Sequence, residues 1–264
     1  MAESLVLTEL SGNILTVTMN RPEKRNALHG DLLEGLGQAF ERARDDADVK
    51  GVLLRGEGKA FSAGIDFMWL GSNTGGVRTM ADFRSFLGIL QGRFNAMECI
   101  EKPIVAAIHG ACVGLGLELA LACDFRIATR SAQIGMPEVK VGLIPDVGGT
   151  TRLVRTVGLA QAKELVMTGR VIPAEEAHRI GLVNHVVQDS DLIPRSRALL
   201  EEIGKNAPLA VGLAKRIIDR GLSLDKQSLL ELEALGQSTL LTTEDFREGA
   251  MALMERREPK FQGR

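Results

Sequence analysis

The sequence predicts an α/β fold in which strands alternate with helices, followed by a mainly helical C-terminal region. In the first half of the chain, runs of β-branched residues are repeatedly followed by a glycine-rich turn and then by a segment whose apolar residues recur at helical spacing. From about residue 196 onward the pattern is almost purely helical. We therefore expect two parts, residues 1–195 and residues 196–264.

The elements of the first part follow in order along the chain. Residues 13–20 (NILTVTMN) and 50–55 (KGVLLR) have the composition of strands. A helix is expected between them behind Asp31, a candidate N-cap, because the apolar residues Leu33, Leu36 and Phe40 fall at helical spacing. The next elements expected are a buried strand at 102–110, a helix at 114–123 and one or two strands within 124–138.

Further predictions concern one loop and the C-terminal helices. The glycine-rich stretch 71–76 (GSNTGG) is predicted to be mobile and to precede a helix with the apolar residues Phe83, Phe86, Leu87 and Leu90. Near the end of the chain, residues 207–221 are predicted to form a helix that ends at Gly221. Residues 244–257 place their apolar side chains on one helical face, which we expect to pack on the main body or on another subunit.

The composition favours a globular protein that acts on small molecules. The chain has 264 residues, a formal net charge of -2 and no long basic run, which argues against a nucleic-acid partner. No stretch is apolar for long enough to span a membrane, and the N-terminus lacks the pattern of a signal peptide. The three cysteines suggest neither a disulfide framework nor a metal-ligand pair, so a cytoplasmic protein is expected.

Several common kinds of catalytic site find no support in the sequence. The four histidines are not spaced as metal ligands, and we therefore expect no metal. The chain contains neither a G-x-S-x-G nucleophile motif nor a phosphate-binding P-loop. Gly114 and Gly116 match the first two glycines of a dinucleotide-binding motif, but Leu119 stands at the third glycine position. The motif therefore gives little support for a nucleotide cofactor.

Two small-residue turns are candidates for binding an oxyanion. Glycines at 110, 114 and 116 lead from a strand into a helix, where backbone N-H groups of the first turn can hold a negative oxygen, and Glu118 lies one turn away. The turn at 58–66 could supply a second donor, because Ala63 and Gly64 carry little bulk. Taken alone, each turn is better explained by a purely structural role, in which the small residues form a tight turn and Glu118 is a favourable acid near a helix N-terminus.

Glu138 and Asp146 stand out in the apolar and glycine-rich run GMPEVKVGLIPDVGGT. Apolar surroundings raise the proton affinity of a carboxylate and suit it to acid or base catalysis. A proline directly precedes each of the two acids and restricts the backbone there. Spacing alone does not distinguish such a role from that of two solvated loop acids.

Four blocks of the chain resemble the crotonase superfamily of enoyl-CoA hydratases and isomerases. In order, they are RPEKRNAL (21–28), GKAFSAGID (58–66), KPIVAAIHGACVGLGLELALACDFRIA (102–128) and IGMPEVKVGLIPDVGGTTRL (134–153). The resemblance continues through TGRVIPAEEAHRIGLVNHVV (168–187) and the closing residues 244–264, and so runs through nearly the whole chain.

This resemblance implies a crotonase-like spiral of ββα units followed by helices that mediate trimer formation, with trimers commonly paired into hexamers. It implies an acyl-CoA thioester as substrate and no separate cofactor. It also implies that the backbone N-H groups of Ala63 and Leu115 bind the thioester oxygen and stabilise an enolate-like state. Leu115 replaces a glycine often found at its position, which leaves the main-chain donor in place.

Within the resembled family, the positions of the acids distinguish hydratases from isomerases. Glu118 and Glu138 occupy the positions of the two glutamates of typical hydratases, which add water to a trans-2-enoyl-CoA to give 3-hydroxyacyl-CoA. Asp146 stands where those hydratases have a small residue, and an acid there resembles dienoyl-CoA isomerases, which move a proton along the acyl chain. Isomerisation would use Glu138 and Asp146. Hydration is slightly favoured over this reaction. A non-catalytic acyl-CoA-binding protein on the same fold is the alternative from another class.

The resemblance also nominates substrate contacts. Arg25 and Ala27 match backbone positions that contact coenzyme A, and Lys260 and Phe261 are further candidates from the C-terminal tail. The acyl chain is expected against Met68, Trp69 and Leu70 and the helix that follows. The contacts expected around the thioester come from the two small-residue turns, namely Ala63, Gly64, Ile65, Asp66, Gly114 and Leu115.

Overall fold

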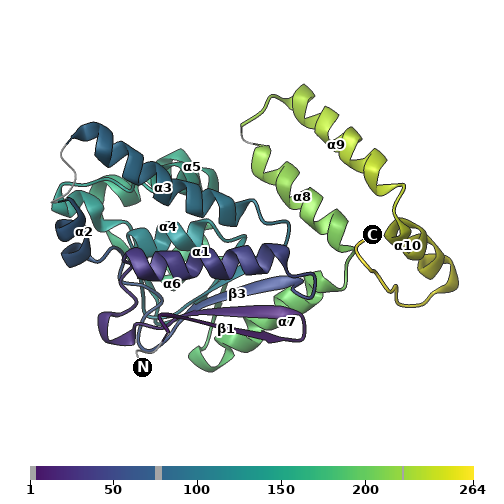
Figure 1. Ribbon diagram of the computed structural model, residues 1–264, viewed down its shortest axis with the longest axis horizontal. Helices are drawn as coiled ribbons and strands as arrows, with labels where there is room; N and C mark the ends of the chain where they lie inside the picture. Colours follow the sequence, from purple (N-terminus) through teal and green to yellow (C-terminus); the bar gives the residue numbers. More distant parts are fainter. Residues whose placement is uncertain (1–3, 75–78, 222) are drawn as a thin grey trace.

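A six-stranded sheet forms the centre of the computed structural model, which describes residues 4–74, 79–221 and 223–264 (Figure 1). The strands lie in the order β1 (Val6–Ser11), β2 (Ile14–Met19), β3 (Gly51–Gly56), β4 (Ile104–Ile108), β6 (Phe125–Thr129) and β9 (His185–Val187). The first pair is antiparallel and the other neighbours are parallel. The strands predicted at 13–20, 50–55 and 102–110 are confirmed as β2, β3 and β4.

The chain also forms a smaller, three-stranded sheet. It consists of β5 (Ala111–Val113), β7 (Gln133–Gly135) and β8 (Val171–Pro173). β5 and β7 are parallel, and β8 pairs with β7 in the antiparallel sense. The segment 124–138 therefore contains two strands, β6 and β7, one in each sheet.

Helices cover both faces of the large sheet. The helices of this part are α1 (Gly30–Asp45), α2 (Phe67–Thr74), α3 (Met80–Glu98), α4 (Leu115–Leu121), α5 (Gly149–Thr168), α6 (Ala174–Arg179) and α7 (Leu192–Gly204). Of these, α1 packs on one face of the large sheet and α7 on the other. Short 3₁₀ turns complete this part: η1 (Pro22–Lys24), η2 (Pro137–Val141) and η3 (Asp189–Asp191). α4 corresponds to the helix predicted at 114–123.

The N-cap predicted for α1 was wrong. His29, and not Asp31, precedes the helix with extended backbone, and its Nδ1 accepts the N-H of Leu32 at 3.3 Å. Asp31 lies within the first turn, where a negative charge is favourable because of the exposed N-H groups.

β4 shows how the sheet separates two apolar layers. Because side chains alternate along a strand, Ile104, Ala106 and Ile108 enter the main core, while Val105 and Ala107 face the other side. On that other side they pack with Leu192 and Leu200 of α7. This double burial is the reason that β4 reads as a continuous apolar run.

Three helices extend away from the sheets toward the C-terminus: α8 (Pro208–Arg220), α9 (Lys226–Leu240) and α10 (Glu244–Glu255) (Figure 1). The boundary predicted after residue 195 falls inside α7, and α7 packs on the sheet, so the outlying helices begin with α8. Gly221 follows α8 as predicted, although its backbone is right-handed. Lys215 of α8 is tied to Asp124 of the core by an ion pair of 2.9 Å.

The first part of the stretch at 71–76, which was predicted to be mobile, has regular secondary structure. Residues 71–74 form the end of α2, because the carboxylate of Asp66 accepts N-H groups at the start of this helix and favours its formation. Gly75 and Gly76 lie outside the described residues. The helix predicted after this stretch is α3, which opens with reciprocal hydrogen bonds between Thr79 and Asp82.

Candidate active site

The three acids singled out in the sequence come together in the structure. Glu118 lies in the first turn of α4, Glu138 lies in η2, and Asp146 lies in the loop that enters α5. The charges of Glu138 and Asp146 both raise the pKa of Glu118, and the charge of Asp146 raises that of Glu138. The three carboxyl groups therefore titrate as a coupled set.

Glu118 is buried, with an exposed fraction of only 2%. Its Oε1 accepts the N-H of Val147 at 2.8 Å and the N-H of Gly149 at 2.7 Å. The pKa of Glu118 is raised to about 8, mainly by burial and in part by the charges of the neighbouring acids, while the two N-H donors oppose the shift. A proton is therefore retained on this carboxyl near neutral pH.

The Glu138 carboxyl has two buried oxygens that accept no hydrogen bond from another described residue. Burial is the main cause of its raised pKa. One of its oxygens lies against Gly114, since a β-carbon at Gly114 would be 3.0 Å from Oε1. Gly114 has a φ of +55°, so a side chain there would be strained as well as crowded. The carboxyl is thus held beside the start of α4, and both of its oxygens remain able to accept hydrogen bonds.

Asp146 is half-buried, and burial raises its pKa. Its position is fixed through the backbone, because its carbonyl accepts a hydrogen bond of 2.6 Å from Nε2 of Gln91 on α3. The side chain makes no hydrogen bond with another described residue. Asp146 is therefore a third carboxyl that is free to meet a substrate.

The two backbone N-H groups predicted to form an oxyanion hole differ in availability. The N-H of Leu115 is the first of α4 and has no acceptor among the described residues, as expected at a helix N-terminus. The N-H of Ala63, in contrast, donates to the carbonyl of Arg25 at 2.9 Å. In this structure Ala63 is already engaged and offers no free donor.

Ile65, two residues further on, carries the free N-H of this turn. The carbonyl of Gly64 and the N-H of Asp66 both bond to Leu28, so the N-H of Ile65 points to the opposite side and has no described acceptor. The turn runs beside the start of α4, because a β-carbon at Gly64 would lie 2.9 Å from the carbonyl oxygen of Val113 and 3.6 Å from the nitrogen of Leu115. The pair of free donors is thus Ile65 and Leu115.

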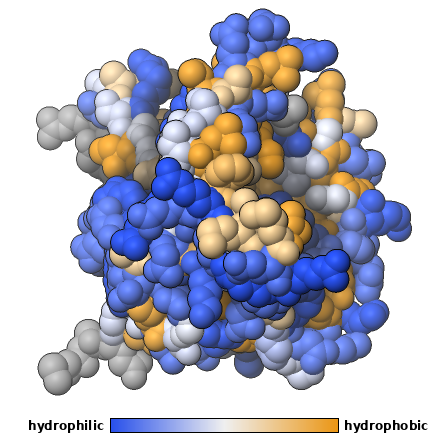
Figure 2. All heavy atoms as spheres, turned by 90° about the vertical axis from the view of Figure 1, so that its right-hand side faces the viewer, coloured by the Kyte–Doolittle hydropathy of each residue, from blue (hydrophilic) through white to orange (hydrophobic). Residues whose placement is uncertain are grey.

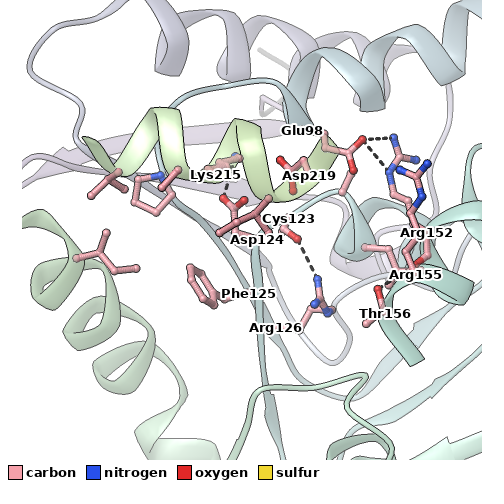
Figure 3. A pocket seen from close by; sticks show the side chains of 17 residues that line it. Glu98, Cys123, Asp124, Phe125, Arg126, Arg152, Arg155, Thr156, Lys215 and Asp219 are labelled. Atoms are coloured by element: carbon pink, nitrogen blue, oxygen red, sulfur yellow. Dashed lines mark hydrogen bonds and ion pairs between the residues drawn. The ribbon is translucent and has the colours of Figure 1, made fainter. Parts of the chain in front are cut away.

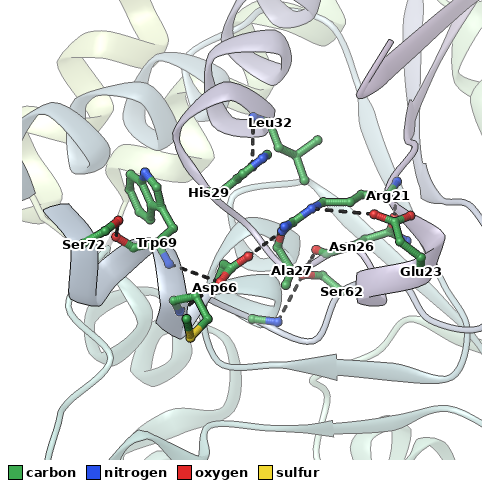
Figure 4. A network of polar contacts seen from close by, with 12 residues as sticks. Arg21, Glu23, Asn26, Ala27, His29, Leu32, Ser62, Asp66, Trp69 and Ser72 are labelled. Carbon is green, nitrogen blue, oxygen red and sulfur yellow. Dashed lines mark hydrogen bonds and ion pairs between the residues drawn. The ribbon is translucent and has the colours of Figure 1, made fainter. Parts of the chain in front are cut away.

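A polar network that the sequence reasoning missed holds this turn in place (Figure 4). Asn26 is fully buried, and its Nδ2 donates to the carbonyls of Glu57 and Ala60 at 2.9 and 2.8 Å. Ser62 donates through Oγ to the carbonyl of Asn26 at 2.8 Å. The only sequence signal was the position of Asn26 inside the block RPEKRNAL.

Asp66 and Met68, both predicted substrate contacts, have other surroundings. Asp66 pairs with Arg21 at 2.7 Å, and this hydrogen bond is the main cause of its lowered pKa (Figure 4). Met68 is 85% exposed. Its neighbour Trp69 instead packs against Phe86 of α3, with ring centroids 5.8 Å apart.

The candidate coenzyme A contacts fall in two places. Arg25 is exposed and Ala27 half-buried in the segment before α1, close to the turn that carries Ile65. Lys260 and Phe261 instead contact α10: the N-H of Lys260 donates to Glu248 at 2.7 Å, and Phe261 lies against Gly249. The structure does not bring these two tail residues to the acids of the same chain (Figure 1).

Neither a metal site nor a membrane-spanning helix is found among the described residues. No group of three or more His, Cys, Asp or Glu side chains there is arranged to hold a metal ion. No described helix is long and apolar enough to cross a membrane. The predicted cytoplasmic location stays a prediction.

Comparison with known proteins defines the class. The sequence model of the enoyl-CoA hydratase/isomerase family matches residues 9–264, and the chain belongs to this family. It is 40% identical over 254 residues to a short-chain-enoyl-CoA hydratase of Clostridium acetobutylicum, covering 96% of this chain and 95% of the relative. It is 37% identical over 262 residues to a crotonyl-CoA hydratase of Syntrophomonas wolfei, with 99% of each chain covered.

The fold agrees with solved structures of the same family. A crystal structure of an enoyl-CoA hydratase from Bacillus anthracis superposes with a TM-score of 0.92 at 35% identity and covers 98% of this chain and 100% of that one. The predicted crotonase-like fold with a helical C-terminal region is therefore confirmed.

The raised pKa of Glu118 predicts a pH-dependent stability. An acid whose pKa rises from 4.5 to about 8 on folding is harder to ionise in the native state, so its contribution to the free energy of unfolding falls as pH increases through this window. Glu118→Gln keeps an oxygen acceptor for the two N-H groups but does not ionise. We expect its melting temperature, relative to the wild type, to rise by several degrees between about pH 6 and about pH 9.

Glu201→Gln, an exposed substitution on α7, serves as the control and is expected to show no such trend. Calorimetric scans of the three proteins across this pH range provide the measurement. A Glu118→Gln difference that stays constant with pH would contradict the assignment of a buried, proton-retaining carboxyl.

Proposed function

We propose that this protein is an enoyl-CoA hydratase, which adds water to a trans-2-enoyl-CoA to give 3-hydroxyacyl-CoA. One observation carries the proposal: two carboxyl groups with raised pKa, Glu118 and Glu138, flank the start of α4 next to two unpaired backbone N-H groups. The relatives, which include a short-chain-enoyl-CoA hydratase and a crotonyl-CoA hydratase, support the same reaction.

The free N-H groups of Ile65 and Leu115 bind the thioester carbonyl oxygen of the substrate. When water adds to the β-carbon, electrons move toward this oxygen and it gains negative charge, so donors fixed in advance bind the transition state more strongly than the ground state. One such donor is worth roughly 3 kcal/mol in other enzymes. This pair takes the role that the sequence had suggested for Ala63 and Leu115.

Glu118 and Glu138 together move the two protons of the reaction. The ionised carboxyl takes a proton from water as the water oxygen bonds to the β-carbon, and the double bond shifts into the enolate. The protonated carboxyl then gives its proton to the α-carbon, which forms a C-H bond and restores the thioester. The pair begins and ends with one proton, as a coupled pair of buried acids favours near neutral pH.

Isomerisation is a second candidate, and it rests on Asp146. This acid is half-buried, has a raised pKa and lies close enough to Glu138 to raise the pKa of that residue. Two carboxyls along an acyl chain can remove a proton from one carbon and return it to another.

The alternative from another class is a non-catalytic acyl-CoA-binding protein. Binding of CoA esters without turnover would support it.

In this proposal coenzyme A is the part of the thioester substrate by which the protein binds it, and no separate cofactor is needed. We propose that the exposed Arg25, which lies close to Ala27 and to the turn that carries Ile65, binds the phosphates of coenzyme A. Lys260 and Phe261 serve a neighbouring copy of the chain, since they lie on the outlying helical region of their own chain.

The outlying helices are proposed to assemble the chain into a trimer or a pair of trimers. They leave large apolar side chains in solvent, including Ile218 at 72%, Leu235 at 65%, Leu253 at 81% and Met254 at 76% exposed. Figure 2, which views this end of the molecule, shows apolar side chains among polar ones on the surface. Such apolar surface is typical of a subunit interface.

Glu138→Gln tests the hydratase assignment. Because the amide can neither take nor give a proton, we expect kcat for hydration of crotonyl-CoA to fall about 100-fold or more. The loss of the ultraviolet absorbance of the enoyl thioester follows the reaction. Undiminished turnover in the variant would refute the role of Glu138, and an inactive wild type across a panel of enoyl-CoA chain lengths would refute the hydratase assignment.

Asp146→Asn separates the two candidate reactions. If Asp146 is the isomerase acid, the variant retains hydration of crotonyl-CoA but loses conversion of a dienoyl-CoA by about 100-fold. Parallel assays of both substrates with the wild type provide the comparison. An equal loss in both reactions would contradict this division of labour.

Leu253→Glu with Met254→Glu tests the assembly. Two charges on an apolar interface are costly, so we expect the mass in sedimentation analysis to fall from a multiple of three chains to the 28.5 kDa of one chain. Ile89→Glu, at a 60% exposed position on α3, is the matched control and leaves the mass unchanged. A wild type that sediments as a monomer would overturn the proposal.

A further inference from the structure

The loop that positions Glu118 is itself held from its other side. Val147 donates its N-H to Glu118 at 2.8 Å, and its carbonyl accepts a hydrogen bond of 3.1 Å from Nη1 of Arg152. The same peptide segment therefore connects the candidate catalytic carboxyl to a guanidinium group on α5. A displacement of Val147 would disturb both contacts.

Arg152 is braced by a second helix. It is 6% exposed, and its Nη2 donates to Asn95 Oδ1 at 2.6 Å. Its Nη2 and Nε also donate to Glu98 Oε2, at 2.9 and 3.2 Å (Figure 3). Asn95 and Glu98 lie near the end of α3. The guanidinium also packs so closely on Gly148 that a side chain there would collide with it. All three nitrogen atoms of the planar guanidinium thus donate hydrogen bonds, which fixes its orientation.

We propose that Arg152 is a positioning residue for Glu118: it fixes the segment 147–149 so that the N-H groups of Val147 and Gly149 hold the Glu118 carboxyl toward the substrate. The inference rests on the proposed hydratase function and names a residue that acts on the reaction through Glu118. Arg152 itself has no contact with the free oxygens of Glu138.

A lysine cannot reproduce this arrangement. Its ammonium is a single point charge, whereas Arg152 contacts a backbone carbonyl, an amide and a carboxylate in three directions. Arg152→Lys therefore keeps the charge that faces Glu98 while it loosens Val147. Misplacement of a catalytic group by about 1 Å can lower a rate about 100-fold.

Arg155 provides a natural control on the same helix. Arg152 and Arg155 both line a cavity of about 550 Å³ between the core and α8, together with Lys215 and Asp219 (Figure 3). Arg155 donates to Ser223 at 2.7 Å and makes no hydrogen bond to the loop at 147–149. Arg155→Lys changes the same residue type in the same cavity without loosening that loop.

The test compares crotonyl-CoA hydration in the wild type, Arg152→Lys and Arg155→Lys. We expect Arg152→Lys to lower kcat between about 10-fold and about 100-fold, with KM changed less than about 3-fold because the oxyanion donors are untouched. Arg155→Lys is expected to match the wild type. A wild-type kcat in Arg152→Lys would overturn the proposal.

A double-mutant cycle separates positioning from a purely structural role. In a Glu118→Gln background, Arg152→Lys is expected to cause no further loss of kcat, because the group that it positions has already lost its function. The same fold-loss in both backgrounds would show that Arg152 acts on stability or on another residue. If Arg152→Lys does not fold, Glu98→Gln, which removes the charge that braces the guanidinium, replaces it with the same expected pattern.

A readout without turnover distinguishes failure of this inference from failure of the proposed function. The two N-H donors lower the pKa of Glu118, so loosening them moves the pH at which Glu118 ionises upward. That pH is obtained from the melting-temperature difference between Glu118-containing and Glu118→Gln proteins, measured once with Arg152 intact and once in the Arg152→Lys background. An unchanged midpoint overturns the positioning role even if the wild type proves to catalyse another reaction.

Discussion

The burial of one carboxyl group, that of Glu118, is the constraint on which the rest of the site depends. An ionised carboxylate in apolar surroundings is costly, and here the cost is met by retaining a proton and by two backbone N-H donors. Those donors come from the segment 147–149, which must therefore approach α4 closely and be held there by Arg152. The same segment begins directly after Asp146, so the loop that stabilises one acid also delivers another.

The oxyanion donors depend on a second constraint, the close approach of two chain segments. Gly64 lets the turn at 62–65 lie against the start of α4, and Gly114 lets Glu138 lie against the same place. The buried amide of Asn26 fixes the turn through carbonyls that would otherwise be unsatisfied. In the proposed mechanism, donors and acids that the fold holds before substrate arrives act on the transition state rather than on binding alone.

Much of the fold followed from the sequence because burial on both faces leaves continuous apolar runs, as in β3 and β4. β1 escaped notice because it is an edge strand with four exposed residues, and its pattern resembles a loop. In the candidate site, the sequence singled out three acids that the structure brings together, whereas the N-H without a described acceptor lies at Ile65, two residues beyond Ala63. The N-H of Ala63 is taken by the carbonyl of Arg25, whereas the bonds of Leu28 to Gly64 and Asp66 leave the N-H of Ile65 without a described acceptor, and no local motif reveals this pairing. Arg152 was not identified, because its role comes from contacts with α3 that no local motif reveals.

The pH dependence of kcat/KM for crotonyl-CoA tests the central claim most directly, namely that Glu118 and Glu138 work as a pair with one shared proton. The account predicts a bell-shaped profile for the wild type whose alkaline limb lies near pH 8, where the pair loses its remaining proton. In Glu118→Gln the residual activity should lack this limb. A wild-type profile that is flat through pH 8, or a limb that persists unchanged in the variant, would contradict the account.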